Sequence, residues 1–180
     1  GDNLAPYERV AKAYRAATGK ELAARAIHEM SPRADGAFVA RNAATIPEGL
    51  VAVELFGNAK NYPNPGMAER GGLVGESDGG SLFLDEIGEL PESAQAKLLR
   101  ALESGEIRRV GATEVEYPDV RVVAATNRDL MEEVHQGRFR EDLFFRLNVL
   151  GVNLPSLRER PSDIRMLCEL ICRDLHAEAH

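Results

Sequence analysis

Short apolar runs and longer stretches of helical periodicity alternate along this chain. Four segments predict strands: residues 38–40, 81–84, 120–127 and 150–154. The second and third are of the type buried in a parallel sheet. Strands separated by helices predict an α/β fold with a mostly parallel sheet and helices on both faces. One residue of each run is therefore expected on neighbouring strands, namely Val39, Phe83, Val122 and Val152.

Helices are predicted where apolar residues recur at helical spacing. They are expected at residues 5–17, 22–28, 48–56, 91–104, 129–136 and 138–147, with a last helix starting at Pro161. Residues 57–76 are rich in glycine, proline and asparagine and predict a long loop, because the two prolines within it exclude a regular helix. Residues 107–117, around Gly111, predict a small hairpin.

Composition restricts size, partners and surroundings. The 180 residues, 44% of them hydrophobic, suffice for one well-cored domain with a small appendage. A net charge of −7 argues against a standing nucleic-acid surface. Cys168 and Cys172, four apart in a helical segment, predict two core residues in a reduced, cytosolic protein. The sequence shows neither a signal peptide nor a membrane-spanning run, so we expect a cytoplasmic location.

The clearest candidate chemistry follows the run at 81–84, where two acids are adjacent: Asp85 and Glu86. Open α/β sheets bind ligands at the carboxyl ends of their parallel strands. Alternation sends the two carboxylates in different directions, so that one can hold the water shell of a metal while the other orients an attacking water. This is the arrangement of a Walker B element. By itself the pattern fits capping of the next helix about equally well.

A second candidate is the segment Thr18, Gly19, Lys20 and Glu21, which opens the predicted helix at 22–28. A Gly-Lys pair at a helix start is half of a phosphate-binding loop, because backbone N–H groups and the lysine attract phosphate. The full pattern requires a preceding strand and a glycine at the position of Tyr14. Taken alone, the segment is better explained as an ordinary helix start.

Five segments together carry a family resemblance: residues 54–57, 79–91, 125–130, 139–143 and 157–161. In sequence and order they resemble the AAA+ ATPase domain of bacterial enhancer-binding proteins, the NtrC class of sigma-54-dependent activators. The resemblance runs from about Thr18 to the carboxyl terminus. It implies an AAA+ P-loop NTPase three-layer sandwich, with residues 1–160 as the nucleotide-binding subdomain and 161–180 as the truncated start of a helical lid.

The resemblance also implies cofactors and roles. ATP would bind at Thr18, Gly19, Lys20 and Glu21, with Lys20 on the phosphates, and Asp85 would hold Mg²⁺ while Glu86 polarises water. Asn127 looks like the residue that senses the γ-phosphate. Asn42 is similar to the asparagine that restrains the catalytic glutamate at rest.

Arg140 and Arg146 look like arginine fingers that reach into a neighbouring subunit's site. Fingers acting in trans imply a homo-oligomeric ring, expected to be a hexamer. From the residues alone, ion pairs with Glu141 or Asp142 on a solvated face are the simpler explanation.

Two departures from the family keep alternatives open. The family has a strand and a glycine-rich loop where this sequence passes from a predicted helix ending at Ala17 directly to Thr18. Either residues are missing between Ala17 and Thr18, or a true deletion has left a domain that cannot hold ATP. Loss of that central strand would leave its neighbours unpaired.

The second departure is in the loop that grips sigma-54, where the family carries Gly-Ala-Phe-Thr-Gly-Ala. Residues 61–66 stand there instead, with Tyr62 as the only aromatic residue. We expect this loop to be exposed and poorly ordered. The absence of receiver and DNA-binding domains suggests a fragment of a longer protein.

Three functions therefore remain. The first is an ATP-driven ring that remodels the sigma-54 RNA polymerase holoenzyme. The second is a degenerate module that acts by oligomerisation, and the third is an ATPase acting on another client.

Overall fold

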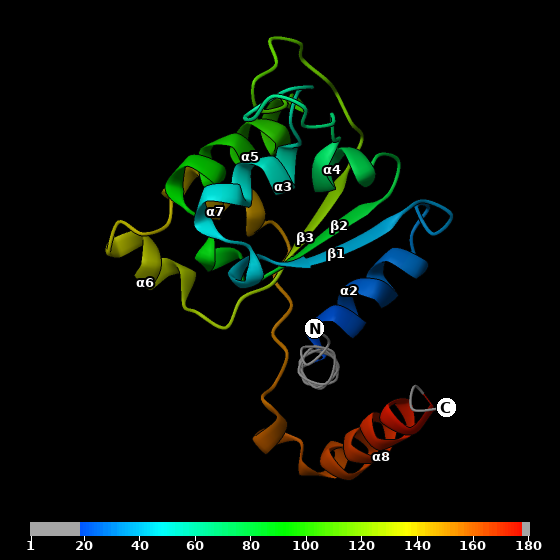
Figure 1. The fold of residues 1–180 in the computed structure, drawn as a ribbon. Coiled ribbons are helices and arrows are strands. Elements are labelled where there is room, and N and C mark those ends of the chain that lie inside the picture. Colours follow the sequence, from blue (N-terminus) through cyan, green and yellow to red (C-terminus); the bar gives the residue numbers. More distant parts are fainter. Residues whose placement is uncertain (1–18, 178–180) are drawn as a thin grey trace. The chain divides into compact units, whose positions relative to one another are not determined.

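The computed structural model describes residues 19–177. The chain divides into two compact units, Ala24–Gly151 and a second that combines Gly1–Ala23 with Val152–His180. The sheet belongs to the first unit (Figure 1). The helix predicted at 5–17, the junction between Ala17 and Thr18, and Thr18 itself lie outside the described residues.

Three parallel strands form the sheet in the order β1 (Phe38–Asn42), β2 (Ser81–Asp85), β3 (Arg121–Ala124). The register pairs Val39 with Leu82 and Leu82 with Val122. Every residue of β2 is buried, as expected for an apolar strand paired on both sides. The predicted parallel α/β sheet and its first three strands are confirmed.

Helices cover both faces of the sheet, as predicted. Leu82 and Leu84 point into a core that they share with α3 (Val51–Phe56), α5 (Glu92–Ser104) and α7 (Glu141–Leu147). Ser81 lies on the opposite face by alternation, where its hydroxyl meets His28 Nδ1 of α2 (Lys20–Glu29) at 2.9 Å. The remaining elements are η1 (Ala43–Thr45), η2 (Glu48–Leu50), α4 (Gly72–Glu76), η3 (Ile87–Glu89), α6 (Leu130–His135), η4 (Leu157–Glu159) and α8 (Pro161–Ala177).

The strand predicted at 150–154 is wrong, and so is the placement of Val152 in the sheet. Residues 151–156 have no regular structure, and Leu150 and Val152 are 82% and 63% exposed. A strand requires a neighbouring backbone to pair with, and within residues 19–177 no strand pairs with this segment. For the same reason β3 is half-exposed instead of buried, since among the described strands it pairs only with β2. This exposure is what loss of a neighbouring strand would produce.

Two smaller predictions are also corrected. Residues 72–76 form α4 instead of ending the long loop, because Leu73 and Val74 are buried in the core. The cysteines at 168 and 172 are exposed on α8 instead of lying in a core. Their spacing places both on one helical face, and that face is turned to solvent.

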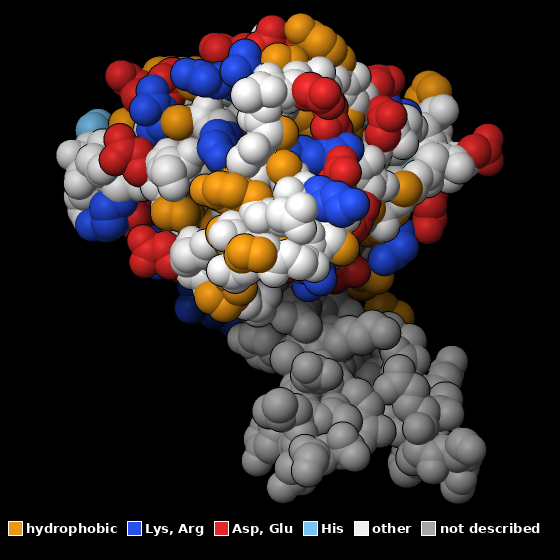
Figure 2. Space-filling view, turned by 45° about the horizontal axis from the view of Figure 1, so that its top comes forward, with side chains coloured by type: hydrophobic (Ala, Val, Ile, Leu, Met, Phe, Trp, Pro, Cys, Tyr) orange, Lys and Arg blue, Asp and Glu red, His pale blue; other side chains and the backbone are white. Residues whose placement is uncertain are grey.

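The hairpin predicted at 107–117 is present in reduced form. Ile107 and Glu116 exchange both backbone hydrogen bonds, at 2.9 and 3.0 Å, and Gly111 turns the chain at φ 82°. None of the helices described between residues 19 and 177 combines the length and hydropathy of a membrane span. Lys and Arg side chains are interspersed with Asp and Glu over the face shown in Figure 2.

Candidate active site

Asp85 and Glu86 mark a sharp turn at the end of the central strand. Asp85 is buried, and its Oδ1 accepts a hydrogen bond from the Glu86 backbone N–H at 3.0 Å. Glu86 adopts φ 52° and ψ 49°, a left-handed conformation that non-glycine residues seldom occupy. Such residues gather at functional sites. The Glu86 side chain makes no cap hydrogen bond to the following η3, so the helix-capping explanation is not supported for this residue.

The structure brings Glu86 together with Asn127, which follows β3. Asn127 donates twice to this carboxylate, from its backbone N–H to Oε2 at 3.1 Å and from Nδ2 to Oε1. The contact is possible because the carboxyl ends of parallel β2 and β3 lie at one edge of the sheet. Two of the residues singled out in the sequence therefore share one site.

Asn42 ends β1 in register with Asp85, at the same edge of the sheet. Its Oδ1 accepts a hydrogen bond from Ala44 N at 2.9 Å and caps η1. Two of the hydrogen bonds that Glu86 accepts come from Asn127.

The candidate phosphate loop lies at the amino end of α2. Gly19 has φ 79°, a conformation for which glycine is suited, and α2 begins at Lys20 with Glu21 in its first turn. A β-carbon on Gly19 would lie 3.3 Å from Nη2 of Arg160, so a guanidinium borders this backbone. All of these residues belong to the unit of Gly1–Ala23 and Val152–His180.

The two candidate fingers differ in their contacts. Arg140 immediately precedes α7 and forms a two-pronged pair with Asp142, with Nε–Oδ1 at 3.0 Å and Nη2–Oδ2 at 2.7 Å. This hydrogen-bonded pair holds the pKa of Asp142 below its usual value. Arg146 instead donates from Nε and Nη2 to the Leu102 carbonyl in the last turn of α5, at 3.1 and 2.6 Å. The surface ion pair considered for Arg140 is therefore present, whereas Arg146 joins α7 to α5.

Two buried polar residues that the sequence analysis did not single out hold the segment before α7. Gln95 of α5 is fully buried, and Glu133 of α6 is nearly so. Hydrogen bonds from Arg138, together with the charge of Arg128, lower the pKa of Glu133 to about 2. A signal existed for Gln95: it lies three and four residues before Leu98 and Leu99, on the apolar face of its helix.

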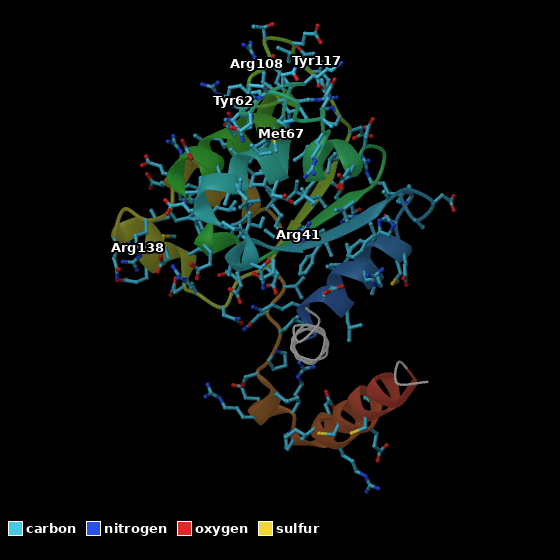
Figure 3. All side chains as sticks on the ribbon, viewed as in Figure 1. Arg41, Tyr62, Met67, Arg108, Tyr117 and Arg138 are labelled. Atoms are coloured by element: carbon cyan, nitrogen blue, oxygen red, sulfur yellow. The ribbon has the colours of Figure 1, made fainter. Side chains whose placement is uncertain are left out.

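The loop after α3 also has a polar centre. Asn58 is fully buried, and its Nδ2 donates to the carbonyls of Ala59, Tyr62 and Ala68 at 2.9, 3.0 and 2.9 Å. The backbone of Asn58 also pairs with Arg70. The loop is therefore exposed at its tip, as predicted, and its base is held by internal hydrogen bonds. Figure 3 shows where the side chains at this end of the unit gather: Tyr62, Met67, Arg108 and Tyr117.

Comparison with known proteins decides the family. A family model described as the Sigma-54 interaction domain matches residues 15–153. The chain belongs to the sigma-54 interaction domain family. Related chains include the Nif-specific regulatory protein of Azotobacter vinelandii, 53% identical over 154 residues that cover 86% of this chain and 30% of that protein. Over 155 residues, the anaerobic nitric oxide reductase transcription regulator NorR of Escherichia coli K12 is 52% identical, covering 86% and 31%.

Solved structures agree with this assignment. NtrX from Brucella abortus in complex with ADP superimposes with a TM-score of 0.79 at 37% identity, covering 99% of this chain and 42% of that one. The P-loop NTPase domain of an E. coli sigma-54 activator shares the fold alone, at 19% identity and a TM-score of 0.51 over 77% and 78% of the chains. The predicted AAA+ fold and family are confirmed. This sigma-54 interaction domain spans about 30% of the length of the curated relatives it matches.

Proposed function

We propose that this sigma-54 interaction domain hydrolyses ATP within a ring of identical subunits. In the cytoplasm, the ring would remodel the sigma-54 RNA polymerase holoenzyme and so activate transcription. The observation that carries the proposal is the Glu86–Asn127 pair, in which a strained acid is held at the carboxyl edge of a parallel sheet. The similar NtrX of Brucella abortus was solved in complex with ADP, the product of such a reaction.

Phosphates would bind at Gly19, Lys20 and Glu21, where α2 offers backbone N–H groups and a lysine. The buried Asp85 carboxylate supplies the oxygen donor that Mg²⁺ prefers. Among residues 19–177 no group of three or more metal-binding side chains occurs, which suits an ion held mainly by phosphates and water. Bound Mg²⁺ would neutralise charge on the phosphates.

Glu86 would accept the proton of the attacking water. It is the acid that lies just beyond the end of β2, in a left-handed turn. Asn127 would hold Glu86 in the resting state through the two hydrogen bonds described above. Because its amide is also a donor suited to a γ-phosphate, phosphate and carboxylate would compete for Asn127. Asn42 would support the same edge from β1.

Arg140 would act in trans on the neighbour's phosphates after leaving Asp142. An exposed ion pair is weak enough to exchange for a phosphate. Arg146 is assigned to hold α7 against the carboxyl end of α5. A finger in trans requires an oligomer, and a hexameric ring is the form we propose.

A second candidate rests on the sheet. The half-exposed β3 and the unpaired residues 150–154 favour a degenerate module that oligomerises without hydrolysis. Residues 61–66 differ from the family's Gly-Ala-Phe-Thr-Gly-Ala segment, which supports a client other than sigma-54 for an active or a degenerate domain.

Mixing two inactive variants tests the first candidate against the second. Lys20→Ala should lose its own site but keep its finger, and Arg140→Ala should do the opposite. Mixed rings should regain ATP hydrolysis at sites that combine an intact Lys20 with a neighbour's Arg140. Co-assembly is checked by fluorescence transfer between labelled subunits. Rings that co-assemble without regaining activity would contradict a finger in trans, and a wild-type protein without hydrolysis would favour the degenerate module.

A further inference from the structure

The segment that leads into α7 is fastened to the rest of the unit by one buried amide. Gln95 Nε2 donates to the carbonyls of Leu90 and Arg138 at 2.8 and 3.0 Å. Its Oε1 accepts the backbone N–H of Arg140 at 2.8 Å. Both donors and the acceptor of the side chain are thus used, and the backbone on which Arg140 is mounted is fixed.

A second anchor holds the same segment by charge. Glu133 accepts from Arg138 through Oε2–Nε at 2.8 Å and Oε1–Nη2 at 2.6 Å. The Glu133 backbone carbonyl also accepts the N–H groups of Arg138 and Phe139, at 2.9 and 3.1 Å. Arg138 lies beside α6 in Figure 3. Glu133 therefore holds Arg138 by its backbone and its side chain, and Phe139 by its backbone.

Both anchors lead back to the residues of the hydrolytic site. Leu90 immediately follows η3, the turn that begins after Glu86. Glu133 also accepts Arg128 Nη1 at 3.2 Å, and Arg128 follows Asn127 directly and pairs with Glu89. Glu86 and Asn127 are themselves hydrogen-bonded. The path through Gln95 starts just after Glu86 and ends at the backbone N–H of Arg140. The path through Glu133 starts just after Asn127 and ends at Arg138 and Phe139, the two residues before Arg140.

We infer that Gln95 and Glu133 are positioning residues for the arginine finger: they set the Arg140 backbone for its reach into a neighbouring subunit. The inference rests on the proposed function, because it requires a finger in trans. Neither residue touches the reacting atoms, so each acts through Arg140. Small displacements of such a group are costly in rate, about a hundredfold for 1 Å.

A purely structural role is the competing explanation, since a buried amide and a buried carboxylate also satisfy backbone groups in any core. The two explanations predict loss of activity from a substitution in different subunits. A positioning residue matters in the subunit that donates the finger, whereas a structural residue matters in both subunits of a pair.

The test uses the mixture of Lys20→Ala and Arg140→Ala variants of the full protein. Gln95→Ala is added to one of these two variants in one mixture and to the other variant in a second mixture. On the Lys20→Ala donor, it should lower the restored turnover roughly tenfold or more, with an unchanged KM for ATP. On the Arg140→Ala acceptor, it should leave restored turnover largely unchanged. Equal loss in the two arms, or no loss in the donor arm, would overturn the inference.

The mixture without Gln95→Ala distinguishes failure of the proposed function from failure of this inference. If co-assembled Lys20→Ala and Arg140→Ala restore nothing, the proposed function fails before Gln95 is involved. If Gln95→Ala does not fold, Glu133→Gln takes its place in both arms, since it keeps the side-chain volume while removing the charge that holds Arg138. A loss confined to the donor arm supports the inference, and any other distribution contradicts it.

Discussion

Two buried amides, Gln95 and Asn58, organise two different surface segments of the first unit. Gln95 joins elements far apart in sequence: its partners lie five, 43 and 45 residues away. The side chain of Asn58 bonds only within its own loop, to carbonyls one, four and ten residues ahead. Gln95 therefore connects residues 138–140 to the segment that follows Glu86, whereas the side chain of Asn58 ties the loop after α3 together from within.

On the proposed function, this difference would allow ATP hydrolysis and client binding to be altered separately. A loop that carries its own polar centre can change its tip sequence without disturbing the site. The finger segment lacks this freedom because its anchors run through residues that follow Glu86 and Asn127. We expect substitutions in the two regions to separate cleanly, and the following predictions test that separation.

The largest structural effect is expected for Asn58→Ala. Three carbonyls would lose their donor at a fully buried position, and the free energy of unfolding should fall by about 2–4 kcal/mol. ATP turnover per folded molecule should persist while remodelling of the client is lost. Thermal denaturation and phosphate release measure the two effects, with the exposed Asn64→Ala as the matched control. If Asn58→Ala also lost ATP turnover per folded molecule at 25 °C, the loop and the hydrolytic site would not be separable.

Tyr62→Ala should affect the tip more narrowly. Tyr62 is 43% exposed and packs on Gly111, where a β-carbon would lie 2.4 Å from its Cγ. We expect normal ATP hydrolysis and loss of stable binding to sigma-54 holoenzyme in the presence of an ATP transition-state analogue, because exposed aromatic residues dominate small interfaces. If the unaltered protein hydrolyses ATP yet does not bind this holoenzyme, the client is a different one.

The smallest effect concerns Glu133 and pH. Its folded pKa of about 2 lies below the ordinary 4.5, so the ionised acid stabilises the folded state above pH 4.5 and this contribution fades as the pH falls toward 2. Glu133→Gln should therefore lower Tm by a few degrees at pH 7, and the difference from wild type should shrink in acid. Exposed Glu103→Gln is the control. A Tm difference that is constant from pH 7 to pH 3 would contradict the assignment.

The sequence predicted the parts of the fold whose signal is local. Continuous apolar runs located β1 and β2, and the adjacent acids marked the carboxyl end of β2. The strand predicted at 150–154 failed because pairing depends on a distant backbone, which no local pattern can supply. The contact between Glu86 and Asn127 was not predicted, since their hydrogen bonds depend on the left-handed turn at Glu86.

The anchors escaped prediction for a related reason. Gln95 lies on an apolar helical face. A polar residue there is expected to have a buried hydrogen-bond partner, but the sequence does not identify that partner. Its partners, Leu90 and Arg138, act through backbone carbonyls, and any residue type has those. The roles of Arg140 and Arg146 were likewise indistinguishable in the sequence, and only their contacts with Asp142 and Leu102 set them apart.

The most direct test of ATP hydrolysis at this edge is Glu86→Gln in the full protein, with ATP binding and phosphate release measured on the same sample. The amide keeps the size of the side chain but cannot take a proton from water. Binding should remain close to wild type while hydrolysis falls by about a hundredfold or more. Hydrolysis that continues at the wild-type rate in Glu86→Gln would contradict the assignment of this residue and of the site built around it.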